Sequence, residues 1–270
     1  MRMYYLGIIG ALSSLGQGVI AKLNEHPSEF KIVFKVDDRY PKNNLLSGEF
    51  RNLEQVLTHN INPTVVLDFG IAGTVFERAK FYRDYAMPAI MQCAFGNEKS
   101  DILRNTSTIA GNDYAPLILI PDFSIIKVLI MKNLKGLLNC FASDVQRIRI
   151  DILYNTERYN NQNQWLYWAN VINEVLGKPT NYYREQGNTL DCGLVQYGFM
   201  RINSLDKNEE SINLQIFNSQ KDTIFRYEMQ YNLLSSRING AMKVLDWYLY
   251  QDHHKPRLNN LFSDMLTELV

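Results

Sequence analysis

The first part of the chain alternates between short apolar runs and amphipathic stretches with helical spacing. Between the first two runs, Leu15, Val19 and Leu23 recur at the spacing of one helix face. Five apolar runs have the length of buried strands: residues 3–9, 30–36, 65–69, 89–93 and 116–120. Because strands that alternate with helices are typical of βαβ units, this part predicts a Rossmann-like, doubly wound parallel sheet of the α/β class.

The pattern changes after residue 121. Residues 123–141 predict one long helix, and residues 145–154 alternate between apolar and charged side chains, as in a strand with one wet face. A further helix is predicted at 164–176, followed by a Gly and Pro stop signal. The later segments then cluster as strands: runs at 193–202, 212–217 and 223–233, before a helix at 240–250. This half predicts a second α+β domain on an open mixed sheet.

These two patterns predict the domain organisation. Residues 1–122 are predicted to form a dinucleotide-binding Rossmann-like domain, and residues 123–239 a smaller α+β domain. Completion of the first domain by C-terminal helices at 240–270, and substrate binding and oligomerisation by the second, are implied by the family resemblance that the motifs below carry.

Composition narrows the class of partner. The chain has 28 basic and 28 acidic side chains, and this balance argues against an electrostatic grip on nucleic acid or an anionic membrane. The longest apolar run, at about 116–130, is broken by polar residues, so no transmembrane helix is expected. No signal-peptide pattern follows Met1, and three widely spaced cysteines suit a reducing compartment. We therefore expect a cytoplasmic protein with a small-molecule substrate.

Histidine is scarce, which limits the possible chemistry. The four histidines are His26, His59, His253 and His254, and none lies between residues 60 and 252. A histidine-centred catalytic or zinc site in the middle of the chain is therefore excluded. The adjacent His253 and His254 have no ligand partners at metal-binding spacing, so no metal site is predicted.

A glycine turn follows the first predicted strand. In a Rossmann unit such a turn brings backbone N–H groups and a helix N-terminus to the cofactor pyrophosphate. Ser13 stands where a GxxGxxG pattern has its middle glycine, and its hydroxyl is a possible phosphate donor. The expected cofactor-binding residues of this turn are Gly10, Leu12, Ser13, Ser14, Leu15 and Gly16. A purely structural turn without a ligand is the alternative.

The second predicted strand ends in a carboxylate. Asp37 lies at the position from which an acidic side chain accepts hydrogen bonds from the adenosine ribose, which favours NAD(H). Arg39, two residues on, is suited to a 2′-phosphate, so NADP(H) stays open.

Several separated stretches, in order, resemble the dihydrodipicolinate reductase family. Besides the glycine turn, residues 65–69 are similar to the "IDF" strand end of that family, and residues 93–96 stand where it has Gly-Thr-Thr-Gly beside the nicotinamide. Residues 121–124 are similar to its Asn-Phe-Ser motif at the domain crossover, and residues 239–241 and 261–266 to its C-terminal helix. The resemblance implies further cofactor-binding residues: Phe69, Gly70, Cys93, Ala94, Pro121, Asp122 and Phe123.

The chain departs from that family in its substrate motifs. Where the family has His-His-x-x-Lys, this chain has the segment 154–158, which begins with Tyr154 and ends with Arg158. Asn163, Gln164 and Trp165 replace the family's Ser-Gly-Thr motif, which holds a substrate carboxylate. Tyr154 is then the candidate catalytic proton donor, although an aromatic packed beneath a loop is the alternative. Arg158 is the candidate substrate anchor, with Asn163, Gln164 and Trp165 as further substrate-binding candidates. These departures argue against the family's own reaction.

The leading hypothesis is an NAD(P)-dependent reductase of this fold with an altered substrate. A cyclic imine or an amino-acid-derived unsaturated intermediate of specialised metabolism would suit a kept cofactor turn beside a rewritten substrate loop. Two alternatives stay open: a non-redox cyclase or isomerase, and a non-catalytic binding or regulatory paralogue. The resemblance also implies a homo-oligomer, a tetramer in that family.

Overall fold

The computed structural model divides the chain into two compact units. The first unit is Met1–Phe123 together with Arg237–Leu269, and the second is Ser124–Ser236. The structure describes these ranges: 2–43, 45–70, 74–92, 117–120, 123–141, 145–154, 183–186, 189–192, 195–201, 205–206 and 208–250.

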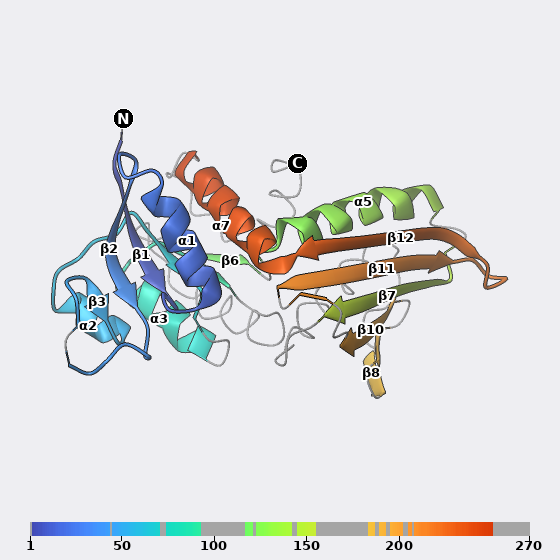
Figure 1. Cartoon of the computed structure of the whole chain (residues 1–270), viewed down its shortest axis with the longest axis horizontal. Helices are drawn as coiled ribbons and strands as arrows, with labels where there is room; N and C mark the ends of the chain where they lie inside the picture. Colours follow the sequence, from blue (N-terminus) through green and yellow to red (C-terminus); the bar gives the residue numbers. More distant parts are fainter. Residues whose placement is uncertain are drawn as a thin grey trace. The chain divides into compact units, whose positions relative to one another are not determined.

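A six-stranded parallel sheet forms the centre of the first unit (Figure 1). Its strand order is β3-β2-β1-β4-β5-β6, which is the order of a doubly wound dinucleotide-binding fold. The strands are β1 (Tyr4–Ile9), β2 (Phe30–Val36), β3 (Glu49–Phe50), β4 (Val65–Asp68), β5 (Ala89–Gln92) and β6 (Leu117–Ile120). The helices of this part are α1 (Ser14–Asn24), α2 (Leu53–Leu57), α3 (Val75–Asp84) and α7 (Leu233–Tyr250).

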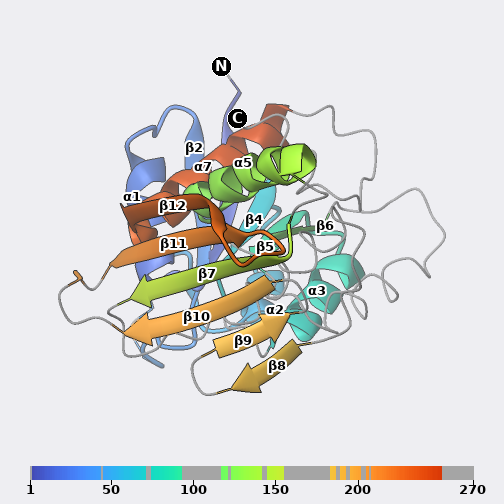
Figure 2. The same cartoon turned by 90° about the vertical axis from the view of Figure 1, so that its right-hand side faces the viewer.

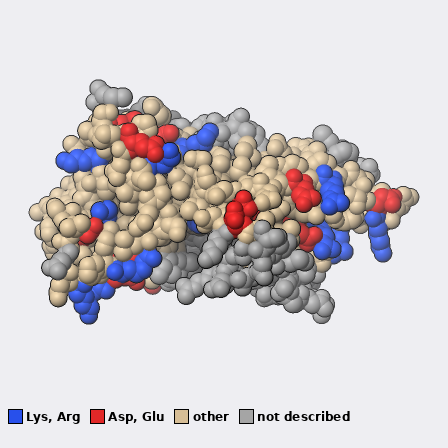
Figure 3. Space-filling view, viewed as in Figure 1, with Lys and Arg blue, Asp and Glu red and all other residues tan. Residues whose placement is uncertain are grey.

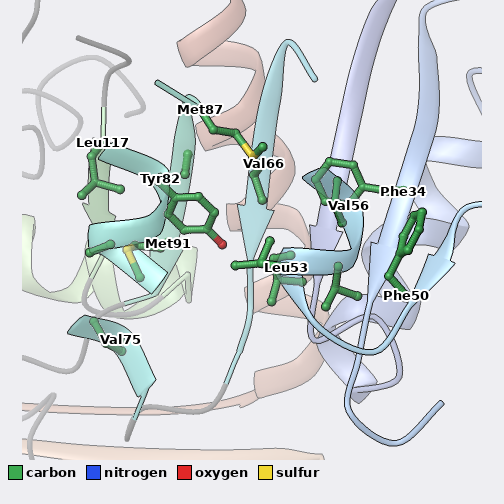
Figure 4. Close-up of a cluster of buried hydrophobic side chains, with 14 residues drawn as sticks. Phe34, Phe50, Leu53, Val56, Val66, Val75, Tyr82, Met87, Met91 and Leu117 are labelled. Carbon is green, nitrogen blue, oxygen red and sulfur yellow. The ribbon is translucent and has the colours of Figure 1, made fainter. Parts of the chain in front are cut away.

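The strands of the first unit are buried because helices cover a parallel sheet on both faces. All four residues of β4 are buried, and so are Leu6, Ile8 and Ile9 on β1 and Ala89, Ile90 and Met91 on β5. Figure 4 shows one resulting cluster, in which the ring of Tyr82 lies among Val66, Met87 and Leu117. This packing holds the carboxyl ends of the central strands in fixed positions.

The second unit contains a mixed six-stranded sheet of order β12-β11-β7-β10-β9-β8 (Figure 2). Strands β7 and β10 pair in parallel, and the other neighbours are antiparallel. Helix α5 (Ile125–Phe141) runs beside β12 in both views. The strands are β7 (Arg147–Tyr154), β8 (Tyr183–Gln186), β9 (Thr189–Cys192), β10 (Val195–Arg201), β11 (Glu209–Phe217) and β12 (Thr223–Asn232).

The predicted fold class is confirmed. Alternation along β7 buries Ile148, Ile150 and Ile152, while Arg147 and Arg149 are exposed on the opposite face. Four short elements were not predicted: β3 and α2 are too short to show a period, and β8 and β9 lack a long apolar run. The helix predicted at 164–176 and the terminal helical segment lie outside the described residues.

The surface and the helices show two further properties. On the face seen in Figure 3, basic and acidic side chains are interspersed instead of gathering into a patch of one sign. Among the helices that the structure describes, none combines the length and apolarity needed to cross a bilayer.

The last described helix begins earlier than its predicted start at Gly240. Strand β12 passes directly into α7 at Leu233, and the side chain of Asn232 accepts a hydrogen bond from Ser235 N at 2.8 Å. Asn232 therefore caps the helix, because it satisfies an amide that has no partner within the first turn. The sequence prediction was wrong here because Leu233 was interpreted as the last residue of the strand and the helix was placed only from Gly240.

We predict that Asn232→Ala lowers the free energy of unfolding by about 1 kcal/mol, since alanine leaves the Ser235 amide uncapped. Asn232→Asp should retain most of the stability. Lys243→Ala, at an exposed position of the same helix, is the matched control. Urea unfolding measures all three, and equal midpoints for Asn232→Ala and Lys243→Ala would contradict the assigned cap.

Candidate functional site

The carboxyl ends of β1 and β4 mark the candidate site of the first unit. The chain leaves β1 for β2 on one side and leaves β4 for β5 on the other, so the two connections diverge at this point. Open α/β sheets bind ligands in the crevice at such a switch point. The two ends are tightly joined, because Phe69 N donates to Ile9 O at 3.0 Å.

Two glycines make the turn after β1 possible. Gly10 has φ +71°, and a Cβ atom on it would lie 2.7 Å from Phe69 O. A Cβ atom on Gly16 would lie 2.3 Å from Gly10 O. Any larger residue would therefore push either the neighbouring strand end or helix α1 away from the turn. The two glycines therefore allow three backbone segments to approach closely: the turn, the end of β4 and the start of α1.

Ser13 has a different role from the one its sequence position suggests. Its hydroxyl oxygen accepts a hydrogen bond from Gly16 N at 2.9 Å, and its proton is donated to Gly10 O at 2.7 Å. Ser13 is thus the N-cap of α1 and closes the turn. The early amides of the helix, at Ser14 and Leu15, have no acceptor within the helix and are the groups suited to an anion.

Asp37, at the end of β2, is held from three directions. Arg39 binds both of its oxygens, with Nε to Oδ1 and Nη2 to Oδ2 each at 2.7 Å. The amides of Leu12 and Arg39 donate to it at 2.8 and 3.1 Å. The carboxylate is only 3% exposed, whereas the Arg39 side chain is 56% exposed. Arg39 therefore covers the carboxylate from the solvent side, and Asp37 ties the end of β2 to the glycine turn by accepting from the Leu12 amide.

The net effect of these contacts on Asp37 is a lowered pKa. Burial of the carboxyl group raises its pKa, but the hydrogen bonds from Arg39 and Leu12, with the charge of Arg39, together lower it by more. The carboxylate form is thus the one that the folded site stabilises.

A second carboxylate, Asp68 at the end of β4, belongs to the segment that resembles the "IDF" strand end but was not among the predicted site residues. It is fully buried, and Arg78 Nε and Tyr82 OH both donate to its Oδ2 at 2.7 Å. Gly70 N donates to Oδ1 at 2.8 Å, and Arg78 also donates to Thr74. Burial, and then the negative charge of Asp68, raise the pKa of Tyr82 far above its ordinary value. The Asp68–Arg78 pair thus anchors both sides of the connection between β4 and α3.

A signal for this network is present in the sequence. Arg78 and Tyr82 are four residues apart on one face of α3, and a basic residue that faces a buried strand end requires an acidic partner. The structure shows that this partner is Asp68, because α3 packs with Arg78 and Tyr82 against the end of β4.

The structure brings seven of the predicted cofactor residues to one edge of the sheet: Gly10, Leu12, Ser13, Gly16, Asp37, Phe69 and Gly70. Ser14 and Leu15 follow in the first turn of α1. Phe123 also lies there, because its ring packs edge-on against Phe69 with centroids 5.3 Å apart. Of the other candidates, Cys93, Ala94, Pro121, Asp122, Arg158, Asn163, Gln164 and Trp165 lie outside the described residues.

Tyr154, the candidate proton donor, belongs to the second unit. It is the last residue of β7 and is partly buried. Its Cα lies opposite that of Glu210 on β11. Within the part of the chain that the structure describes, no group of three His, Cys, Asp or Glu side chains is placed to hold a metal ion.

The residues at the edge of the first unit fit a dinucleotide. Because Gly10 has no Cβ atom, the turn lies directly against the backbone of Phe69. The first turn of α1 contains no acidic residue that would repel an anion. Asp37 supplies an acceptor at the end of β2. Its carboxylate already accepts four hydrogen bonds, however, so a ribose hydroxyl has to compete with Arg39.

Comparison with known proteins gives matches only to solved structures, since no family model and no curated protein matches the chain. Dihydrodipicolinate reductase from Paenisporosarcina sp. TG-14, bound to dipicolinate, is 17% identical with a TM-score of 0.60, covering 90% of this chain and 96% of that one. Myo-inositol 2-dehydrogenase from Lactobacillus plantarum is 10% identical, with a TM-score of 0.65 and coverages of 99% and 94%. GenD2 from gentamicin A biosynthesis, in complex with NAD, is 10% identical, with a TM-score of 0.63 and coverages of 98% and 91%.

These likenesses establish the fold. The chain has the Rossmann-like α/β unit and the mixed-sheet unit found in reductases and dehydrogenases. The resemblance seen in the sequence motifs therefore agrees with the three-dimensional structure at the level of the fold.

The lowered pKa of Asp37 predicts a pH-dependent contribution to stability. A carboxyl group whose pKa is lower in the folded state stabilises the protein above its unfolded pKa, near 3.8, and this stabilisation is lost as the pH falls through the folded value. We expect the free energy of unfolding to fall less between pH 6 and pH 3 in Asp37→Asn than in the wild type. The exposed neighbour Asp38, changed to Asn, is the control. Urea unfolding at the two pH values measures the difference, and an unchanged slope in Asp37→Asn would refute the assignment.

Proposed function

We propose that the protein is an NAD(P)-dependent reductase whose substrate differs from that of dihydrodipicolinate reductase. The observation that carries the proposal is the glycine cradle at the switch point, formed by Gly10 and Gly16 beside Phe69 and joined to Asp37 by the Leu12 amide. Solved structures with this fold support it, among them GenD2 in complex with NAD.

In this proposal the first unit holds the cofactor. The Ser14 and Leu15 amides bind the pyrophosphate, and the backbone at Gly10 permits its close approach. Asp37 and Arg39 meet the adenosine ribose, with Asp37 suited to free hydroxyls and Arg39 to a 2′-phosphate. When bound, a reduced nicotinamide supplies a hydride to an electrophilic carbon.

The second unit is proposed to bind the substrate and supply a proton. Reduction of a C=N or C=C bond leaves an atom that must be protonated, and Tyr154 Oη is the proposed donor. Arg158 is the proposed carboxylate anchor, with Asn163, Gln164 and Trp165 lining the substrate. A cyclic imine or an amino-acid-derived unsaturated compound is the proposed substrate class, because the histidines and the lysine of the related reductases are replaced here.

Self-association is also proposed for the second unit. One face of its sheet carries Arg147, Arg149 and Asp151, which are exposed or partly exposed in the single chain. Packing of this face against a second copy would bury it, and a tetramer is the assembly that the resemblance implies. Sedimentation analysis gives the mass in solution.

The Asp37–Arg39 pair favours one second candidate, a non-redox cyclase or isomerase on the same scaffold. In this reading the carboxylate is occupied permanently by Arg39 and never meets a ribose. Such an enzyme would keep its activity when no nicotinamide is added.

The direct test is a fluorescence titration of the purified protein with NADH and NADPH. The proposed function predicts saturable binding of at least one. Steady-state oxidation of the bound dinucleotide is then followed with 1-pyrroline, 1-pyrroline-2-carboxylate and tetrahydropyridine-2-carboxylate. Absence of binding for both dinucleotides would reject the reductase and leave the non-redox candidate.

Replacement of Arg39 separates the two dinucleotides. Arg39→Ala frees the oxygens of Asp37 for ribose hydroxyls and removes the cation suited to a 2′-phosphate. We expect the ratio of the NADPH to the NADH dissociation constant to rise by about tenfold or more, the order of one charge-assisted contact. Arg51→Ala is a matched control, since Arg51 donates only to the Asp38 carbonyl nearby. An unchanged ratio in Arg39→Ala would exclude Asp37 and Arg39 from the cofactor site.

A further inference from the structure

The second unit contains a buried ionic cluster that plays no part in the proposed site so far. Lys127 on α5 and Glu210 on β11 both have fully buried side chains, and their Nζ and Oε1 atoms are 3.3 Å apart. Tyr231 on β12 is also buried, and its hydroxyl donates to Glu210 Oε1. Three elements therefore meet at one carboxylate.

The sheet register places this cluster beside Tyr154. Glu210 lies opposite Tyr154 on β7 and opposite Tyr231 on β12, so the three residues form one row across neighbouring antiparallel strands. Side chains directly opposite each other in such pairs project to the same face, with Cβ atoms about 5 Å apart. The row is at the end of the sheet where β7 stops, β12 passes into α7 and α5 begins (Figure 1).

The rest of that face near the row is apolar. The rows that follow consist of buried aliphatic side chains on β7 and β11: Ile148, Ile150, Ile152, Ile212, Leu214 and Ile216. On these two strands Glu210 is thus the only charged residue of this face, and it lies in the row that contains the candidate proton donor.

Stability does not account for the position of Lys127. It lies in the first turn of α5, where Ser124 Oγ accepts from the Lys127 amide at 3.4 Å, and a cation at a helix N-terminus is opposed by the helix dipole. Burial opposes the ammonium form as well. A buried ion pair is often no more stable than apolar residues of the same size. Glu210 thus supplies the counter-charge to a buried cation that neither its burial nor the helix dipole favours.

We propose that Lys127, held by Glu210, is the proton reserve for Tyr154. The inference rests on the proposed reductase function and adds a proton relay to it. As the imine carbon gains the hydride that the proposed function supplies, its double bond to nitrogen becomes single and the nitrogen takes the proton of Tyr154 Oη. A proton from the Lys127 ammonium, passed through Glu210, restores the Tyr154 hydroxyl and leaves a neutral amine. After product release the amine takes a proton from water, and Tyr231 keeps Glu210 oriented throughout.

The test compares Lys127→Met, Glu210→Gln and the double variant with the wild type. Each single variant leaves one buried polar partner without its counter-charge, so its urea midpoint should fall. The double variant removes both charges and should regain a midpoint near that of the wild type. The matched control is Lys35→Met with Glu49→Gln, an ion pair of 2.8 Å in the first unit.

Three readouts accompany stability: NAD(P)H titration, kcat and KM with the imine panel, and the effect of D2O on kcat. We expect NAD(P)H binding and KM to change less than about twofold in the double variant. We expect kcat to fall about tenfold or more, with a larger D2O effect, since proton delivery becomes slower. The control pair should leave kcat unchanged.

The possible contradictions are distinct. Recovery of kcat together with the urea midpoint in the double variant would overturn the proposal, as would a double variant no more stable than the singles. A wild type that binds NAD(P)H but reduces no imine would also overturn it. A wild type that does not bind NAD(P)H would reject the proposed function itself, and the titration distinguishes this failure from the others.

Discussion

The absence of a side chain at Gly10 is the constraint on which the candidate site depends. With φ +71° and Phe69 O only 2.7 Å from the position of a Cβ atom, this residue lets the turn after β1 pass against the end of β4. Gly16 then lets α1 pack onto the same turn. The N-terminus of α1, the turn and the end of β4 meet because Gly10 and Gly16 have no Cβ atom to keep them apart.

Two buried carboxylates stabilise this arrangement. They differ in how much of the paired arginine side chain is exposed to solvent. Asp68 is paired with an almost buried arginine, Arg78, so the pair is a permanent part of the packing beneath the site. Asp37 is paired with Arg39, whose side chain is largely in solvent. The Asp68–Arg78 pair is thus enclosed by the packing, whereas the Asp37–Arg39 pair is accessible from solvent on the arginine side.

The second unit also contains a buried ion pair, which lies on one face of its mixed sheet. On β7 and β11 this face is aliphatic except in the row of Tyr154 and Glu210, to which β12 adds Tyr231 and α5 adds the buried cation Lys127. Tyr154 was predicted from a resemblance alone, and no pattern in the sequence assigned a role to Lys127, Glu210 or Tyr231. Their positions in the chain are far apart, and each is an ordinary residue within its own helix or strand.

The sequence by itself determined the order of the main elements, the fold class and the glycine turn, because apolar periodicity and the conformational freedom of glycine act over a few residues. It did not determine the short elements β3, α2, β8 and β9, nor the start of α7 at Leu233, where a cap and not a period marks the boundary. The tertiary structure was needed to establish which charges pair: Asp37 with Arg39 as a cover, Asp68 with Arg78, and Lys127 with Glu210. Asp37 and Arg39 are only two residues apart, but Lys127 and Glu210 are far apart in the chain, and the packing of α5 on the second sheet brings their charged atoms within 3.3 Å. No local sequence pattern encodes that packing.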